Sequence, residues 1–216
     1  CTNISSFTTN YFTFNGATPN GKGWDILTLL FKQNQFVAWG EYHNSPVLSR
    51  LTAYALESAA KQGYKAFCVE TSPFVATELM RIANTKSPAD TLLKLYKSGY
   101  PNIGTLPFFK SKEDAEMLVA VKKFKYAIWG IDQEFQMSFS HCMAKVFGVL
   151  SKKRKKEYQT VYDSLQAKWW YPDTKLLDSL NKITSKKNLK AVLKDIKISK
   201  EIYRNNDNEG RAALKI

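Results

Sequence analysis

Residues 64–74 have the sequence YKAFCVETSPF, and this stretch organises the first half of the chain. Tyr64–Val69 is rich in apolar and β-forming residues, which predicts a buried strand. Glu70 follows directly, and Pro73 then suits the first turn of a helix. The stretch therefore predicts a strand that ends in a carboxylate and continues into a helix.

A stretch upstream, FVAWGEYHNSP over residues 36–46, has the same order of features. Phe36–Gly40 is predicted to be a short apolar strand. Glu41 and His43 follow it with one residue between them, and His43 is one of only two histidines in the chain. A helix with apolar residues at helical spacing is predicted next, ending near Gly63. This strand would therefore end by presenting an acid and an imidazole.

A third stretch, YAIWGID over residues 126–132, predicts a strand over Tyr126–Ile131 that ends at Asp132. Helical patterns fill the segment between the second and third strands, and the last of them has a capping-box pattern of Ser111 with Asp114. Strands separated by helices are typical of parallel pairing through right-handed crossovers. We therefore expect an α/β fold, with a small parallel sheet flanked by helices on both faces.

The ends of the three predicted strands should lie together. Ligands bind beyond the carboxyl ends of the strands in an open parallel sheet. The side chains expected at this rim are those of Glu41, His43, Glu70 and Asp132. Such groups have the capacity for general acid–base chemistry, or for part of a metal site. Gly40 and Gly130 precede the acids and would allow close backbone approach or an unusual φ.

Each of these residues also has an ordinary structural interpretation. Glu70 and Asp132 could each cap the following helix. A lone histidine is more often a structural hydrogen-bonding group, and His141, on an apolar helix, is interpreted in this way. No Cys/His spacing resembles a structural zinc site. The sequence contains no Gly-x-Ser-x-Gly elbow, P-loop or dinucleotide fingerprint.

The composition is that of a folded protein with an uneven distribution of charge. The chain has 216 residues, of which 44% are hydrophobic and 13% aromatic, and its net charge is +13. Lysine is concentrated in residues 151–200, including KKRKK at 152–156. Such lysines are usually a solvated helix face, and the alternative is binding to an anionic surface. The run lacks any nucleic-acid-binding motif, so no nucleic-acid partner is expected.

These features predict three regions along the chain. Residues 1–22 are predicted to be a polar tether with turn residues. Residues 23–140 form the α/β core that carries the site. Residues 141–216 form a lysine-rich helical region that packs on the core or caps it.

The three cysteines, Cys1, Cys68 and Cys142, do not suggest a disulfide scaffold. Cys68 lies in an apolar run and is expected to be buried. Cys1 and the polar TNISSFTTN after it resemble the start of a mature bacterial lipoprotein. That interpretation predicts lipid attachment at Cys1 and a location in the cell envelope, at the outer membrane or cell surface. The alternative is an arbitrary boundary of the sequence.

Residues 40–74 resemble the core of the erythromycin-esterase-like proteins, in which a Gly-Glu with a nearby His ends one strand and the next strand ends in Glu. The form Gly40-Glu41-Tyr42-His43-Asn44 is closer to the related ChaN-type haem-binding lipoproteins, and the Tiki/TraB group is a more distant relative. YAIWGIDQE is similar to the next family strand, which ends in Gly-x-Asp. NNDNEGRAALKI is similar to a family helix with a functional arginine, matched here by Arg211. The resemblance covers roughly residues 35–135 and the last few residues.

The resemblance implies an esterase-like hydrolase with a small-molecule substrate. His43 would be the general base that activates water, Glu41 and Glu70 would orient it or the substrate, and Asp132 completes the catalytic set. Arg50 and Arg211 would bind substrate or stabilise an oxyanion. The remaining candidates for substrate binding are the motif residues Tyr42 and Asn44. No cofactor is required, although a divalent metal or haem would suit the same residues.

The chain also departs from this family. The spacing of Glu41 and His43 is one residue shorter than in typical esterases. Family members carry a later strand and a second His motif, whereas this chain has no third histidine. Either the sequence belongs to a longer chain, or the second half of the fold has been lost. Three functions therefore stay open: a hydrolase, a ligand-binding lipoprotein with haem as the candidate ligand, and an interaction protein with a vestigial site.

Overall fold

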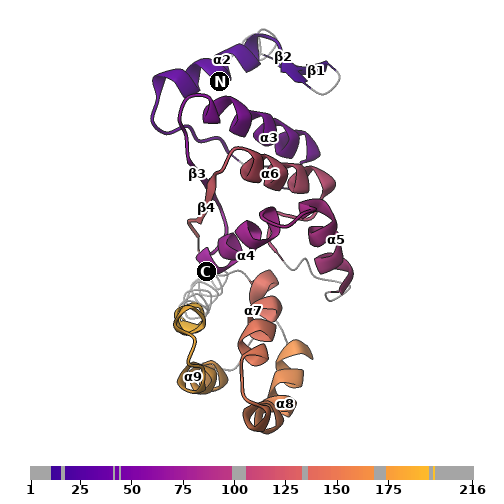
Figure 1. Cartoon of the computed structure of the whole chain (residues 1–216), viewed down its shortest axis with the longest axis vertical. Coiled ribbons are helices and arrows are strands. Elements are labelled where there is room, and N and C mark those ends of the chain that lie inside the picture. The colour runs from indigo at the N-terminus through magenta and orange to yellow at the C-terminus, as the bar shows by residue number, and fades with distance from the viewer. Residues whose placement is uncertain are drawn as a thin grey trace, which may run out of the picture. The chain divides into compact units, whose positions relative to one another are not determined.

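The computed structural model describes residues 11–15, 18–40, 42–43, 45–98, 106–132, 136–167, 174–194 and 197. The helices are α2 (Lys22–Gln33), α3 (Pro46–Ala60), α4 (Pro73–Ala83), α5 (Pro88–Ser98), α6 (Lys112–Lys123), α7 (Gln136–Gly148), α8 (Lys152–Ala167) and α9 (Thr174–Ile183) (Figure 1). Residues 187–194 are also helical. The strands are β1 (Thr13–Asn15), β2 (Thr18–Asn20), β3 (Ala66–Val69) and β4 (Ala127–Gly130). The described chain is therefore mostly helical, with two separate pairs of strands.

Strands β3 and β4 pair side by side in the same direction (Figure 1). The amide of Ala127 donates to the carbonyl of Lys65 at 2.8 Å, and the amide of Ile131 donates to that of Val69 at 3.2 Å. Because both partners advance together along the chain, the pair is parallel. This confirms the predicted parallel pairing for two of the three expected strands.

The third expected strand, Phe36–Gly40, is not a strand in the structure. Its apolar side chains pack locally instead: Val37 lies against the cluster of Phe31, Ala55 and Ala59. The rings of Trp39 and Phe31 also lie in contact, with centroids 6.3 Å apart. Phe36 remains 89% exposed. The apolar run reflects packing on α2 and α3 rather than membership of the sheet.

The strand pair is also covered differently from the prediction. Ala66 and Cys68 in β3 are exposed, as are Ala127 and Trp129 in β4. Ile128 is buried. The described residues therefore cover one face of the pair, and the prediction that Cys68 is buried is wrong because its side chain belongs to the other face.

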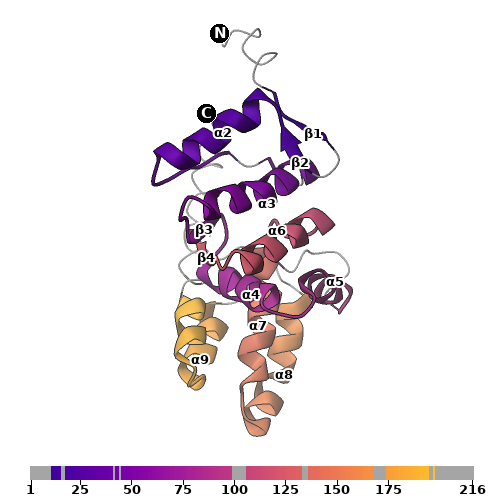
Figure 2. The same cartoon turned by 45° about the horizontal axis from the view of Figure 1, so that its top comes forward.

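Within the segment predicted as a tether, β1 and β2 pair antiparallel (Figure 2). The amide of Gly23 donates to the carbonyl of Tyr11 at 2.9 Å, which joins the start of α2 to the chain before β1. Gly21 has a φ of 102°, which only glycine adopts readily, and it lies at the N-terminus of α2. This small ladder was not predicted.

The chain divides into two compact units. The first unit comprises Cys1–Cys68, Leu79–Leu95 and Phe108–Trp129, and the second comprises Val69–Glu78, Tyr96–Pro107 and Gly130–Ile216. In the first unit α3 packs along α6 (Figures 1 and 2). The hydroxyl of Ser49 donates to Asp114 at 2.7 Å, and that of Tyr126 donates to the carbonyl of Leu56 at 2.9 Å. These bonds connect α3 to the N-terminal turn of α6 and to the segment between α6 and β4.

In the second unit α7, α8, α9 and the helical residues 187–194 surround one apolar cluster. The rings of Phe147 and Tyr162 stack with centroids 4.2 Å apart and join α7 to α8. The buried members of the cluster are Cys142, Met143, Val146, Leu150, Leu177, Leu180 and Leu193. The predicted helical character of this region is confirmed where the structure describes it. None of the described helices combines the length and the apolar character that crossing a membrane requires.

Candidate functional site

The carboxyl ends of β3 and β4 position two of the predicted acids. Glu70 follows β3 and is exposed, and Asp132 follows β4 and is half-buried. The amide of Asp132 donates to the carbonyl of Thr71 at 3.0 Å. This bond extends the strand pairing beyond β3 and β4, so the backbone at Asp132 lies beside the backbone that follows Glu70. The prediction that these two acids end neighbouring parallel strands is confirmed.

Gly130 explains why the two chain segments approach so closely at this point. A Cβ atom at Gly130 would lie 2.2 Å from the carbonyl oxygen of Ser72, far inside van der Waals contact. The predicted need for close approach is therefore confirmed at Gly130. At Gly40 it is wrong, because a Cβ atom there would meet no described atom from elsewhere in the chain within 4 Å.

The start of α4 shows that Glu70 is not the residue that caps this helix. The side chain of Ser72 accepts a hydrogen bond from the amide of Val75 at 3.1 Å, which is the geometry of an N-cap. Ser72 is fully buried at this turn. Because Ser72 performs the capping, the exposed Glu70 is not needed for it.

A buried hydroxyl lies beside the same carboxyl ends. The Oγ1 atom of Thr71 is shielded from solvent and has no hydrogen-bond partner in the described part of the chain. A buried hydroxyl left unsatisfied costs stability, so such groups in native proteins call for an explanation. A bound polar ligand would satisfy it.

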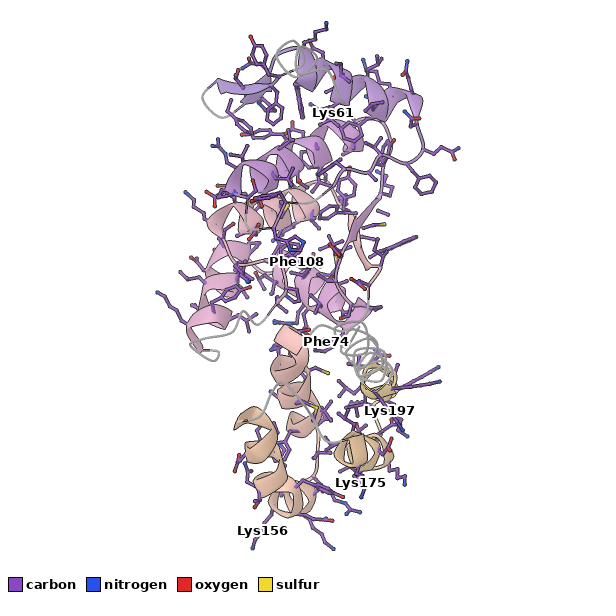
Figure 3. The ribbon with its side chains drawn as sticks, turned by 180° about the vertical axis from the view of Figure 1, so that it is seen from behind. Lys61, Phe74, Phe108, Lys156, Lys175 and Lys197 are labelled. Atoms are coloured by element: carbon purple, nitrogen blue, oxygen red, sulfur yellow. The ribbon has the colours of Figure 1, made fainter. Side chains whose placement is uncertain are left out.

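His43 lies in the first unit, next to an aromatic residue that the sequence did not identify. Its ring is 4.4 Å from that of Phe108, tilted by 46°. Phe108 has a φ of 63°, a region that bulky residues rarely adopt, and Figure 3 labels its position. Strained backbone of this kind concentrates at functional sites, where the surrounding structure holds it in place.

The other predicted site residues have separate environments or lie outside the described chain. The guanidinium of Arg50 lies 4.6 Å from the ring centre of Phe14, which is a cation–π contact. Tyr42 is 81% exposed. The residues outside the described chain are Cys1, Glu41, Asn44 and Arg211.

A group of charged side chains in the second unit was not predicted. His141 Nε2 lies 3.3 Å from Glu78 Oε2, and Lys145 Nζ lies 3.4 Å from the same oxygen. The ring of His141 also contacts Phe74, with centroids 5.9 Å apart. His141 and Lys145 are four residues apart on α7, so the spacing was visible in the sequence, but the facing Glu78 was not. These contacts agree with a structural role for His141.

In the described chain, no three His, Cys, Asp or Glu side chains form a group that could hold a metal ion. The chain also matches no known protein family, and no curated protein or solved structure is detectably similar to it. The resemblance to the erythromycin-esterase-like proteins therefore depends on the motif residues themselves.

Proposed function

We propose that the chain is a hydrolase of the erythromycin-esterase-like type, which uses water to cleave an ester-like small molecule. The observation that carries this proposal is the pairing of β3 with β4, which brings Glu70 and Asp132 to neighbouring strand ends. Ligands of parallel sheets bind at this edge. The buried hydroxyl of Thr71 at the same place adds a polar group that a ligand would satisfy.

The proposed reaction needs two proton transfers. A base removes a proton from water, and the water oxygen attacks the carbonyl carbon of the ester. The bond from that carbon to the leaving oxygen then breaks, and an acid gives a proton to the alcohol that departs. Glu70 and Asp132 have side chains suited to such transfers.

The resemblance adds further residues to this proposal. It assigns the role of general base to His43 and substrate contacts to Arg50, Arg211, Tyr42 and Asn44, with Glu41 as an orienting acid. These roles follow from the motif alone.

The test is hydrolysis of a panel of chromogenic esters by the purified chain. Glu70→Gln, Asp132→Asn and His43→Ala should each lower kcat/KM by about 100-fold or more, because each removes a group that transfers a proton or orients the group that does. Glu116→Gln changes an exposed carboxylate on α6 and is the matched control, which should keep full activity. Unchanged melting temperatures would show that the variants are folded. Full activity in both Glu70→Gln and Asp132→Asn would contradict the proposal.

A second candidate is a ligand-binding protein without catalysis, with haem as the ligand. It is favoured by the exposure of Trp129 in β4 and of Ile131 directly after β4, which are 59% and 68% exposed. Exposed apolar residues at a strand pair are suited to a flat apolar ligand. Haem should then shift its Soret band with the wild type but not with Trp129→Ala, while Trp39→Ala serves as the control. An unshifted band in the wild type would exclude this candidate.

A further inference from the structure

Helix α8 begins with basic residues, which is unfavourable for the helix dipole. Helices α2, α5 and α6 each place an acid in the first turn and a lysine in the last. This order suits the helix dipole, which is positive at the N-terminus. Helix α8 instead begins with KKRKK, has no acid in its first turn and no basic residue in its last. The local energetics of the helix therefore do not account for these cations.

Local contacts use only two of the five basic residues. Arg154 pairs with Glu157 at 2.7 Å, and the ammonium of Lys155 donates to the carbonyl of Gly148 at 2.9 Å. The other three, Lys152, Lys153 and Lys156, are exposed and have no hydrogen bond or ion pair with any described residue. We call these three residues the α8 lysine set. Figure 3 shows Lys156 pointing away from the ribbon.

The rest of the second unit adds to the same positive charge. From Lys145 to Lys197 the described chain has thirteen lysine or arginine residues against three acids. In the helical residues 187–194, Leu193 is buried in the apolar cluster, whereas Lys187, Lys190 and Lys194 are exposed. These helices are thus amphipathic, with a lysine-rich outer face.

The chemistry of this face favours phospholipid headgroups over nucleic acid. Twelve of the thirteen cations are lysine, a compact point charge, whereas the planar fork of arginine is the group preferred in nucleic-acid recognition. Clusters of four to eight basic residues on an amphipathic helix are typical of anionic lipid binding. Val149, just before α8, is 46% exposed and adds an apolar side chain close in sequence to these lysines.

We propose that the start of α8 binds the surface of an anionic phospholipid bilayer through Lys152, Lys153 and Lys156. The lysines neutralise headgroup phosphates, and this attraction offsets their unfavourable position at the helix N-terminus. The proposal is independent of any hydrolase activity.

The test uses the full chain without a lipid on Cys1, so that any vesicle binding comes from the protein surface. The chain should sediment with phosphatidylcholine vesicles that contain phosphatidylglycerol, but not with phosphatidylcholine alone. About 1 M salt should release it, because the Debye length falls to about 3 Å. Lys152→Gln/Lys153→Gln/Lys156→Gln should weaken binding by about tenfold or more.

The matched control is Lys86→Gln/Lys94→Gln/Lys97→Gln, which removes the same charge from exposed positions of the first unit and α5. It should weaken binding by less than about twofold, since it removes the same net charge but leaves the α8 lysine set intact. Equal losses in the two triple variants would show that net charge alone is responsible and would overturn the proposal. Tighter binding to duplex DNA than to the vesicles would overturn it as well.

A charge-reversal variant of α8 distinguishes lipid binding by these lysines from a helix face that is only exposed to solvent. Lys152→Glu/Lys153→Glu should raise the melting temperature without vesicles by about 1–3 °C, because acids suit the helix N-terminus. The same variant should lose vesicle binding. A higher melting temperature with unchanged binding would overturn the proposal.

Discussion

Gly130 and Gly40 occupy equivalent places in two similar stretches of sequence, yet their surroundings differ. Each follows an apolar run and comes one or two residues before an acid. The sequence predicts the same role for both, which is to allow close backbone approach or an unusual φ. Only Gly130 lies against another backbone, that of Ser72. The difference depends on the partner segment, which no local pattern of residues reveals.

Gly130→Ala should therefore destabilise the protein, whereas Gly40→Ala should not. The added Cβ at Gly130 would meet the carbonyl oxygen of Ser72 at 2.2 Å, and backbone cannot move aside cheaply. The free energy of unfolding should fall by about 1–3 kcal/mol, measured by urea denaturation. Gly40→Ala adds a methyl group to open space and should change it by at most about 1 kcal/mol. Equal effects of the two changes would contradict this account.

The ionisation of Tyr126 makes the stability of the protein depend on pH in the alkaline range. Burial, with a smaller contribution from Tyr64, raises the pKa of the Tyr126 phenol from 10.0 to about 12. The folded state holds this proton more tightly than the unfolded state does. The resulting stability, about 2–3 kcal/mol, is complete below pH 10 and is lost as the pH rises to about 12.

Tyr126→Phe tests this dependence. The variant should lose about 1 kcal/mol at neutral pH, because the hydroxyl no longer donates to the carbonyl of Leu56. Between pH 10 and about 12 its free energy of unfolding should decline less steeply than that of the wild type. Lysines titrate in both proteins, so the difference between the two slopes isolates Tyr126. Identical slopes would argue against a raised pKa.

At the scale of the element, α6 shows what a local motif can predict. The pairing of Ser111 with Asp114 predicted a capping box, and the structure has both of its reciprocal hydrogen bonds. Asp114 also accepts from the hydroxyl of Ser49 at 2.7 Å and from the amide of Lys110 at 2.7 Å. The cap thus also joins α6 to α3, which the motif did not indicate because Ser49 lies far away in sequence.

Asp114→Ala should consequently cost more than the loss of an isolated cap. Loss of a cap alone costs about 1 kcal/mol, and further partners left unsatisfied in a buried place should raise the total to about 2–4 kcal/mol. Thermal or urea unfolding measures the loss. Glu113→Ala removes the neighbouring acid of the same first turn and should cost less than about 1 kcal/mol. A similar loss in both variants would mean that the helix dipole dominates.

At the scale of the whole molecule, the excess of positive charge is the main electrostatic feature. The chain has 32 lysine and arginine residues against 19 aspartate and glutamate residues. Repulsion among like charges destabilises a compact state, and salt screens it.

The melting temperature should therefore rise by a few degrees, roughly 2–5 °C, between about 10 mM and 0.3 M sodium chloride. Lys152→Glu/Lys153→Glu lowers the net charge in the lysine-rich region and should reduce this increase. Differential scanning fluorimetry measures both. A melting temperature that falls with salt would indicate that favourable ion pairs outweigh the repulsion.

The sequence alone determined the elements whose signals are local. The helix start at Pro73, the cap of α6, and the strands before Glu70 and Asp132 all follow from neighbouring residues. The tertiary structure decided which segments meet. Only the folded chain pairs β3 with β4, places Gly130 on Ser72, leaves Cys68 exposed and keeps Phe36–Gly40 out of the sheet. An apolar run can be buried equally well by pairing with a strand or by packing on a helix surface. Contacts between residues distant in sequence therefore determine which of the two occurs.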